Sequence, residues 1–155
     1  MLNLQQAIEA VAGRAGWLVP AEDAQGVTRV RLEGGLALEF RSPDGRTAVL
    51  SADLGEVPGD ASPDYWTQLG KAACGCLRRR PSVLSVEGGR FELFRMLDLS
   101  RLDADEFVQE TEGFLNDEAW WAGELESARD ASGTPASGAS PFAFGGAWTA
   151  FDWKL

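Results

Sequence analysis

The chain has 155 residues, enough for one domain with a modest hydrophobic core. Its 24 acidic residues outnumber 14 basic ones, and the net charge of -10 argues against nucleic acid or an anionic membrane surface as a direct partner. The absence of histidine removes the commonest general base, the commonest zinc ligand and the usual catalytic triads. The composition therefore favours a protein that binds other proteins over an enzyme.

Targeting and metal-binding signals are also lacking. The first residues show no basic segment followed by a long apolar run, and no stretch reaches the roughly 18 apolar residues of a membrane span, so we expect no membrane insertion. The two cysteines, Cys74 and Cys76, are one residue apart, which fits neither a CxxC redox motif nor a four-ligand zinc site. We interpret both as reduced residues of a cytosolic protein, and we expect no metal, no cofactor and no catalytic residue.

The N-terminal region predicts an amphipathic helix over about 3–15. Its apolar stripe comprises Leu4, Ala7, Ile8, Val11 and Ala15. Asn3 has the side chain of a helix cap, and Gly16 is the residue type that ends helices in the left-handed conformation.

Three strands are predicted next. They cover 27–33, 36–41 and 46–54. Apolar and polar residues alternate in the first two, with Val30, Leu32, Leu38 and Phe40 among the apolar positions. Gly34-Gly35 is a two-residue hairpin signal, and Ser42-Pro43-Asp44-Gly45 is a type I turn sequence, so the strands form an antiparallel meander.

A second helix is predicted over about 63–79, with Ser62 as cap and proline at its first position. Its apolar face comprises Trp66, Leu69, Ala73 and Leu77. Three arginines, at 78–80, follow at its C-terminal end. We assign them to the helix dipole and to solvent, in preference to a kinase recognition sequence.

A second hairpin follows, in which the strand at 81–86 reaches the turn Glu87-Gly88-Gly89-Arg90 and the return strand covers about 91–99. The return strand is apolar on both sides. Phe91, Leu93 and Leu97 are assigned to one face, and Phe94, Met96 and Leu99 largely to the other. Such a strand needs two covers, and the second is either a helix of the same chain or a partner subunit.

Residues 102–126 predict a last helix that is strongly acidic and contains no Lys or Arg. Asp103 and Glu106 form a capping-box pair, and Leu102 is placed to pack against Phe107. We interpret the carboxylates as a solvated acidic face, in preference to a divalent-ion site or an acid/base pair. Trp120 and Trp121 are adjacent and cannot share one stripe, so which of them faces the core stays open.

The end of the chain has a different composition. Residues 128–140 predict a flexible linker rich in Ser, Gly and Ala, and 141–155 form an aromatic tail. The tail contains Phe142, Phe144, Trp148, Phe151 and Trp153. We predict that it packs against an apolar groove of the folded domain, in preference to waiting for a partner, since exposed aromatic residues promote aggregation.

The predicted order is α-β-β-β-α-β-β-α. This is an α+β fold, a twisted, largely antiparallel sheet with helices packed on it, in one domain over 1–127. Neither a phosphate-binding glycine loop nor a GxSxG motif is present, so nothing points to nucleotide binding or to a nucleophilic enzyme.

Three stretches resemble the class I type III secretion chaperones, the Tir-chaperone-like family. They are the central hairpin with its exit LSADLGEVP at 50–58, the link LDLSRLDADEF at 97–107, and a last-helix pattern. That pattern comprises Glu112, Phe114, Asn116, Glu118, Ala119, Trp120 and Leu125. The resemblance covers about 1–127. The Cys-Gly-Cys sequence with its three arginines departs from the family pattern, and the aromatic tail has no counterpart in it.

The resemblance implies a homodimer that binds the N-terminal, non-globular segment of a secreted effector in the bacterial cytosol. The implied effector groove comprises Leu4, Ile8, Val11, Val30, Leu32, Leu38 and Phe40. The implied dimer interface comprises Trp66, Leu69, Leu77, Leu84, Phe94 and Met96. The main alternative is an acidic interaction or regulatory domain that sequesters a basic partner protein through the last helix, and an enzyme with a carboxylate-only site is a third class.

Overall fold

The computed structural model describes residues 1–33 and 36–131. Its elements are α1 (Leu4–Ala15), β1 (Val27–Arg31), β2 (Ala37–Arg41), β3 (Thr47–Glu56), α2 (Pro63–Cys76), β4 (Val83–Glu87), β5 (Arg90–Asp98) and α3 (Ala104–Ala131). The predicted order and the α+β class are therefore confirmed. The predicted Gly34-Gly35 turn, the linker from 132 onward and the aromatic tail lie outside the described residues.

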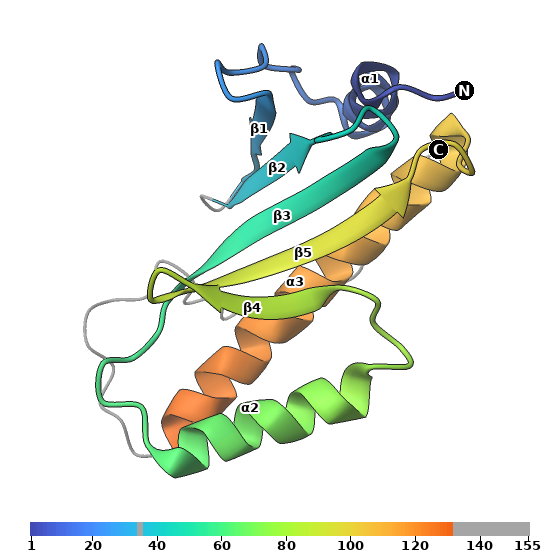
Figure 1. The fold of residues 1–155 in the computed structure, drawn as a ribbon. Coiled ribbons are helices and arrows are strands. Elements are labelled where there is room, and N and C mark those ends of the chain that lie inside the picture. Colours follow the sequence, from blue (N-terminus) through green and yellow to red (C-terminus); the bar gives the residue numbers. More distant parts are fainter. Residues whose placement is uncertain (34–35, 132–155) are drawn as a thin grey trace.

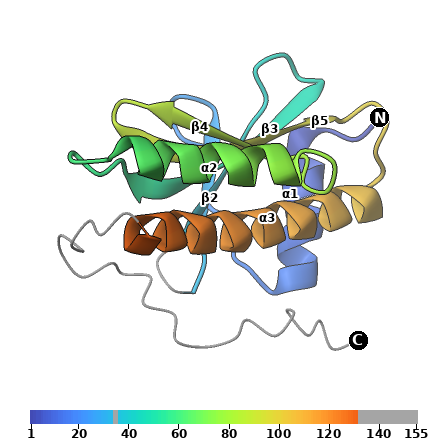
Figure 2. The same ribbon diagram turned by 90° about the horizontal axis from the view of Figure 1, so that it is seen from below.

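The five strands form one antiparallel, twisted sheet in the order β1-β2-β3-β5-β4 (Figure 1). α3 crosses one face of this sheet, α1 lies at the β1–β2 end, and α2 lies along the β4 side (Figures 1 and 2). β1 and β4 are the two edge strands. The sheet therefore presents one edge next to α1 and the other next to α2.

Local sequence signals explain where several elements begin and end. Asn3 and Gln6 form a capping box at the start of α1, and Gly16, with φ of 70°, ends the helix in the left-handed region. The β4–β5 hairpin turns through Gly88 and Gly89, whose φ angles of 57° and 76° match a two-residue turn that favours glycine. The Asn3 cap, the Gly16 end and the glycine turn were predicted, because each depends on residues only a few positions apart.

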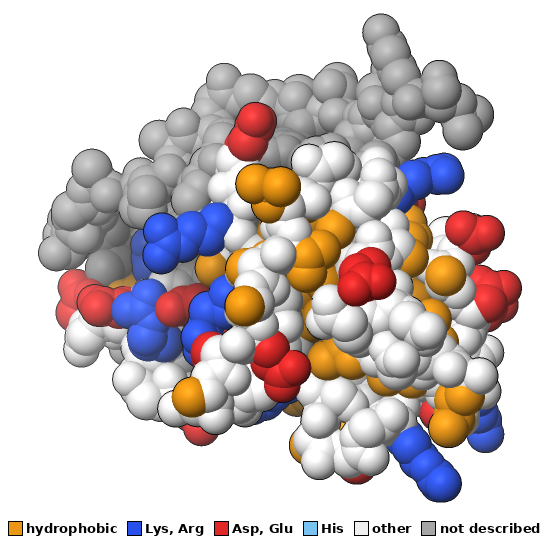
Figure 3. All heavy atoms as spheres, turned by 90° about the horizontal axis from the view of Figure 1, so that it is seen from above, with side chains coloured by type: hydrophobic (Ala, Val, Ile, Leu, Met, Phe, Trp, Pro, Cys, Tyr) orange, Lys and Arg blue, Asp and Glu red, His pale blue; other side chains and the backbone are white. Residues whose placement is uncertain are grey.

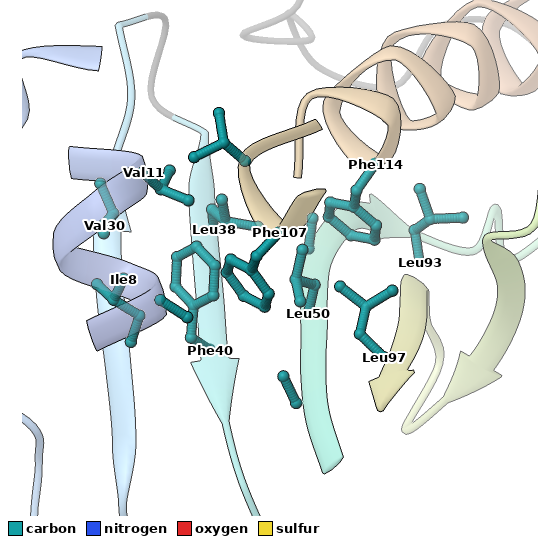
Figure 4. Packing of buried hydrophobic residues seen from close by; sticks show 14 of the residues in the cluster. Ile8, Val11, Val30, Leu38, Phe40, Leu50, Leu93, Leu97, Phe107 and Phe114 are labelled. Atoms are coloured by element: carbon teal, nitrogen blue, oxygen red, sulfur yellow. The ribbon is translucent and has the colours of Figure 1, made fainter. Parts of the chain in front are cut away.

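The core lies between the sheet and the helices. Phe40 of β2 and Phe107 of α3 pack with their ring centroids 6.3 Å apart, and the view in Figure 4 shows both rings close to Ile8 of α1. A second cluster joins α2 to the C-terminal half of α3. It comprises Tyr65, Leu69, Phe91, Leu125 and Ala128.

β5 follows the predicted alternation with one correction. Leu99 was assigned largely to the face of Phe94 and Met96, but it is 1% exposed in the main core. It lies an even number of residues from Leu93 and Leu97, so its side chain shares their buried side. On the other face, Phe94 is partly buried and Met96 is 63% exposed.

Two helix boundaries also differ from prediction. α2 ends at Cys76 instead of 79, and its buried positions are Tyr65, Leu69 and Cys76. α3 continues to Ala131, so residues 128–131 belong to a helix and not to the linker. Ala128 follows Leu125 by three positions and is buried in the same cluster, which explains why the helix continues past the predicted boundary.

Candidate functional site

Five of the seven residues predicted to form the effector groove lie in the hydrophobic core. They are Ile8, Val11, Val30, Leu38 and Phe40, each at most 4% exposed. Figure 4 shows them between α1, the sheet and α3. One chain uses these side chains to fill its own interior, whereas Leu4 and Leu32 are only partly buried. In this conformation those two residues are the part of the predicted groove that an incoming peptide can touch.

Leu4 and Leu32 belong to a set of apolar side chains around α1 and at the end of β1 that are not fully buried. The α1–β1 rim comprises Leu2, Leu4, Trp17, Leu18, Val19 and Leu32. All are partly buried except Leu18, which is 94% exposed. The molecule seen from above, at its α1 and β1 end, shows hydrophobic side chains interspersed with charged ones (Figure 3).

β1 offers backbone groups beside this rim. The Leu32 N–H donates to the Leu36 carbonyl at 2.8 Å, so these two residues form a hydrogen-bonded pair of the ladder. In an antiparallel ladder such pairs alternate, so the backbone groups of Arg29 and Arg31 point away from β2. Within the described part of the chain, the outward N–H and carbonyl groups of Arg29 and Arg31 take part in no backbone hydrogen bond. They form a short edge that can accept an added strand.

The loop that enters β1 is held in place by Asp23. Its carboxylate accepts hydrogen bonds from the backbone N–H groups of Val27 and Gln25, and these bonds lower the pKa of Asp23. Asp23 also pairs with Arg29, which in turn pairs with Glu39 at 2.6 Å. The backbone N–H of Asp23 donates to the outward carbonyl of Val27 at 2.9 Å, so the open part of the β1 edge begins after Val27.

A second apolar surface lies between α2 and β4. This α2–β4 groove has a volume of about 390 Å³, and its lining includes Trp66, Leu69, Leu77, Val83, Leu84 and Val86. Leu77 is 74% exposed, Val83 and Val86 are about half exposed, and Trp66 is 42% exposed. Exposed apolar side chains concentrated along one groove are typical of an interaction surface.

The six predicted dimer-interface residues fall on two surfaces. Four line the α2–β4 groove, with Trp66 and Leu77 exposed, Leu84 partly buried and Leu69 buried. The other two, Phe94 and Met96, lie on the sheet face opposite the core. Their assignment to a dimer interface stays a prediction.

A buried ion network joins α3 to the β4–β5 hairpin. The Arg95 Nη2 donates to Asp117 Oδ2 at 2.7 Å, and its Nη1 donates to Glu110 Oε2 at 2.8 Å. Asp117 also accepts from the Ser82 hydroxyl, and from Arg80 Nη1 at 3.0 Å. The network thus fastens the segment between α2 and β4, which forms one wall of the groove, to α3.

This network corrects two sequence interpretations. The carboxylates of the last helix were assigned to a solvated face, but Asp117 and Glu118 are 3% and 4% exposed. Arg80 was assigned to the helix dipole and solvent, but it reaches Asp117. The sequence did contain a signal for the burial of Glu118, since this residue lies four positions after Phe114 and therefore on the same apolar stripe of the helix. Nothing local pointed to Arg95 as a partner.

Among the described residues, no charged side chain pairs with Glu118, in contrast to Asp117. Burial alone raises the pKa of Glu118 to about 8. Its neighbour Asp117 pairs with Arg95, and successive helical residues point about 100° apart. The two carboxyl groups therefore lie in separate environments on α3. Among the residues that the structure describes, no cluster of three or more Cys, Asp or Glu is arranged to hold a metal ion.

Sequence comparison decides the family. The model of the Tir chaperone protein (CesT) family matches residues 6–121, well over half of the chain. The chain belongs to the Tir chaperone family. The match extends from α1 into α3 and includes the α2–β4 groove and, except for Leu2 and Leu4, the α1–β1 rim. No curated protein matches the chain by sequence.

Solved structures share the fold of this Tir chaperone family member at low sequence identity. A chain of the ExsC–ExsE complex has a TM-score of 0.61 and 17% identity, covering 80% of this chain and 97% of that one. A chain of the chaperone–effector complex HopA1–SchA has a TM-score of 0.59 and 15% identity, covering 77% and 92%. A chain of the heterodimeric ExoU–SpcU complex from the Pseudomonas aeruginosa type III secretion system has a TM-score of 0.58 and 18% identity, covering 77% and 97%.

The two adjacent tryptophans of this Tir chaperone family member have different environments. Trp121 is 2% exposed in the core, which settles the question that the sequence left open. Trp120 is partly buried and packs edge-on against Trp121, with ring centroids 4.9 Å apart. The Arg80 guanidinium lies over the Trp120 ring at 4.9 Å, in cation–π geometry. Across the described residues, no helix is both long and apolar enough to span a membrane.

Proposed function

We propose that this chain is a type III secretion chaperone of the bacterial cytosol. It binds the N-terminal segment of a secreted effector and keeps that segment soluble and ready for export, by binding alone and without catalysis. Membership of the Tir chaperone family supports this function, as does a fold shared with a chain of the HopA1–SchA chaperone–effector complex.

The observation that carries the proposal is the open edge of β1 beside the α1–β1 rim. An extended effector segment can add a strand at Arg29 and Arg31, using main-chain hydrogen bonds that do not depend on its sequence. Apolar side chains of that segment can then contact Leu4 and Leu32 on the rim. The combination suits a client that is non-globular and amphipathic.

A proline substitution tests this binding mode directly. Arg31→Pro removes the outward N–H of β1, and that group makes no bond to β2, so the sheet loses no ladder bond. Arg31→Ala is the matched control, because it removes the same side chain and keeps the N–H. The measurement is the affinity of each full-length variant for the N-terminal segment of an effector encoded beside this chain, with circular dichroism to check folding.

We expect Arg31→Pro to weaken client binding and Arg31→Ala to leave it nearly unchanged. Equal binding by the two variants would show that no strand is added at this edge. Failure of the unchanged protein to bind any neighbouring effector segment would contradict the function itself. Binding that weakens steeply with salt and survives substitution of Leu4 and Leu32 would instead support the sequestration of a basic partner through α3.

The chaperone is also proposed to be a homodimer. The exposed apolar lining of the α2–β4 groove, including Trp66 and Leu77, supports this, since such surfaces are covered in stable assemblies. Light scattering at micromolar concentration distinguishes a dimer from a single chain, and the mass of a single chain would count against the dimer.

A further inference from the structure

The α2–β4 groove is an apolar surface in a strongly acidic protein. The large exposed hydrophobic side chains along it are Trp66, Leu77, Val83 and Val86. Its described lining contains one charged residue, Arg80, and that side chain is already paired with Asp117. An occupant of this groove must therefore be largely apolar and need not carry charge.

The chain leaves the described fold beside one end of this groove. Leu125 and Ala128, near the end of α3, pack in one cluster with Tyr65 and Phe91, and Phe91 also lines the groove. Arg129 Nη2 donates to the Glu56 carbonyl at 3.1 Å, which holds the last turn of α3 against the end of β3. In Figure 2, α2 and the end of α3 lie side by side.

The segment that follows has the composition that such an occupant requires. Residues 132–155 contain five large aromatic side chains and only two charged ones, Asp152 and Lys154, of opposite sign. The eleven steps from Ala131 to Phe142 span roughly 36–40 Å when extended. The groove runs along α2, whose 14 residues cover about 21 Å. The aromatic residues can therefore reach its whole length.

We propose that the aromatic segment Phe142–Trp153 docks in the α2–β4 groove of its own chain. The covalent tether gives the segment an effective concentration in the millimolar range at this groove, so weak aromatic contacts suffice for occupancy. Its small net charge avoids repulsion by the acidic domain.

The docked segment and a second copy of the chain compete for the same groove. This consequence depends on the proposed dimer, whereas the docking itself does not. The segment acts as an internal competitor that shields Trp66 and Leu77 until two chains associate, and it raises the concentration at which the dimer forms.

A photo-crosslinker placed in the segment tests the docking. Full-length Trp148→p-benzoylphenylalanine protein is irradiated as an equal mixture of ¹⁵N-labelled and unlabelled chains, so that mass spectrometry separates crosslinks within a chain from those between chains. We expect crosslinks within a chain, to α2 and β4. Crosslinks to α1 or β1, crosslinks only between chains, or no crosslink to the protein would each overturn the proposal.

Groove variants supply the matched comparison. Val83→Asp together with Val86→Asp introduces two carboxylates where apolar contacts are needed, and we expect the crosslink yield to fall about tenfold. Leu18→Asp introduces a carboxylate at an apolar residue that is 94% exposed and lies outside the groove, and it should leave the yield unchanged. An equal loss of crosslink yield in the groove variant and in Leu18→Asp would overturn the assignment of the aromatic segment to this groove.

Replacing all five aromatic residues of the segment with serine tests the competition. We expect this full-length variant to dimerise at lower concentration than the unchanged chain, as measured by light scattering. An unchanged dimerisation constant would overturn the competition. A chain that stays a monomer in every variant would contradict the proposed dimer, while the crosslinks would still decide the docking.

Discussion

Arg95 on β5 and Asp117 on α3 form an ion pair in the interior of the protein, with Nη2 and Oδ2 2.7 Å apart and both side chains 5% exposed. Two ions removed from water are stable only when their remaining polar atoms are satisfied. Here Glu110 and Ser82 bond to Arg95, while Arg80 and Ser82 bond to Asp117. The pair therefore fixes how α3, the hairpin and the wall of the α2–β4 groove sit together.

Asp117→Asn should destabilise the protein by about 3 kcal/mol, because it leaves the buried Arg95 charge with Glu110 as its one anionic partner among the described residues. Urea unfolding at neutral pH measures the loss. Glu126→Gln, at an exposed carboxylate of the same helix, is the control and should change the stability by less than about 0.5 kcal/mol. A similar loss in both variants would show that the effect comes from net charge and not from the pair.

Two glycines of α3 should respond oppositely to alanine. A Cβ at Gly123 meets nothing within 4 Å, so Gly123→Ala should stabilise the protein by about 0.5–1 kcal/mol through helix propensity. A Cβ at Gly113 would lie 3.0 Å from Arg95 Nη1, whose position Glu110 and Asp117 already determine. Gly113→Ala should therefore destabilise the protein, and thermal unfolding of the two variants compares them. Stabilisation by both would mean that Arg95 has room to move.

Glu118 should make stability fall as the pH rises. Its pKa is about 8 in the folded protein and near 4.5 when unfolded, so between these values the folded state holds a proton that the unfolded state has released. The free energy of unfolding should fall across this window, by on the order of 5 kcal/mol for this one group. Glu118→Gln removes the ionisable group, so this contribution to the free energy of unfolding should no longer change between pH 5 and pH 9. Parallel pH profiles for the two proteins, from urea unfolding, would contradict the buried, protonated carboxyl.

The fold was predictable where its signals are local. The cap of α3 shows this, since Asp103 and Glu106 exchange hydrogen bonds as their spacing predicts. The network was not predictable, because Asp117 and Arg95 are 22 positions apart and only the packing of α3 on β5 brings them together. The same limit applies to the effector groove. Periodicity identified Ile8 and Phe40 as apolar-face residues, but it does not distinguish a face that covers the core from one that receives a client.

Leu77→Asp tests the proposed dimer at its most exposed apolar residue. Leu77 follows the end of α2 and is 74% exposed, so a carboxylate there should leave the single chain folded and oppose any apolar contact with a second copy. We expect dimerisation to weaken by about tenfold or more, measured by light scattering over a concentration series. Leu18→Asp, at a leucine near α1 that is 94% exposed, should dimerise like the unchanged chain. If Leu18→Asp weakens the dimer and Leu77→Asp does not, the interface lies at the α1–β1 end, and the groove is free for another occupant.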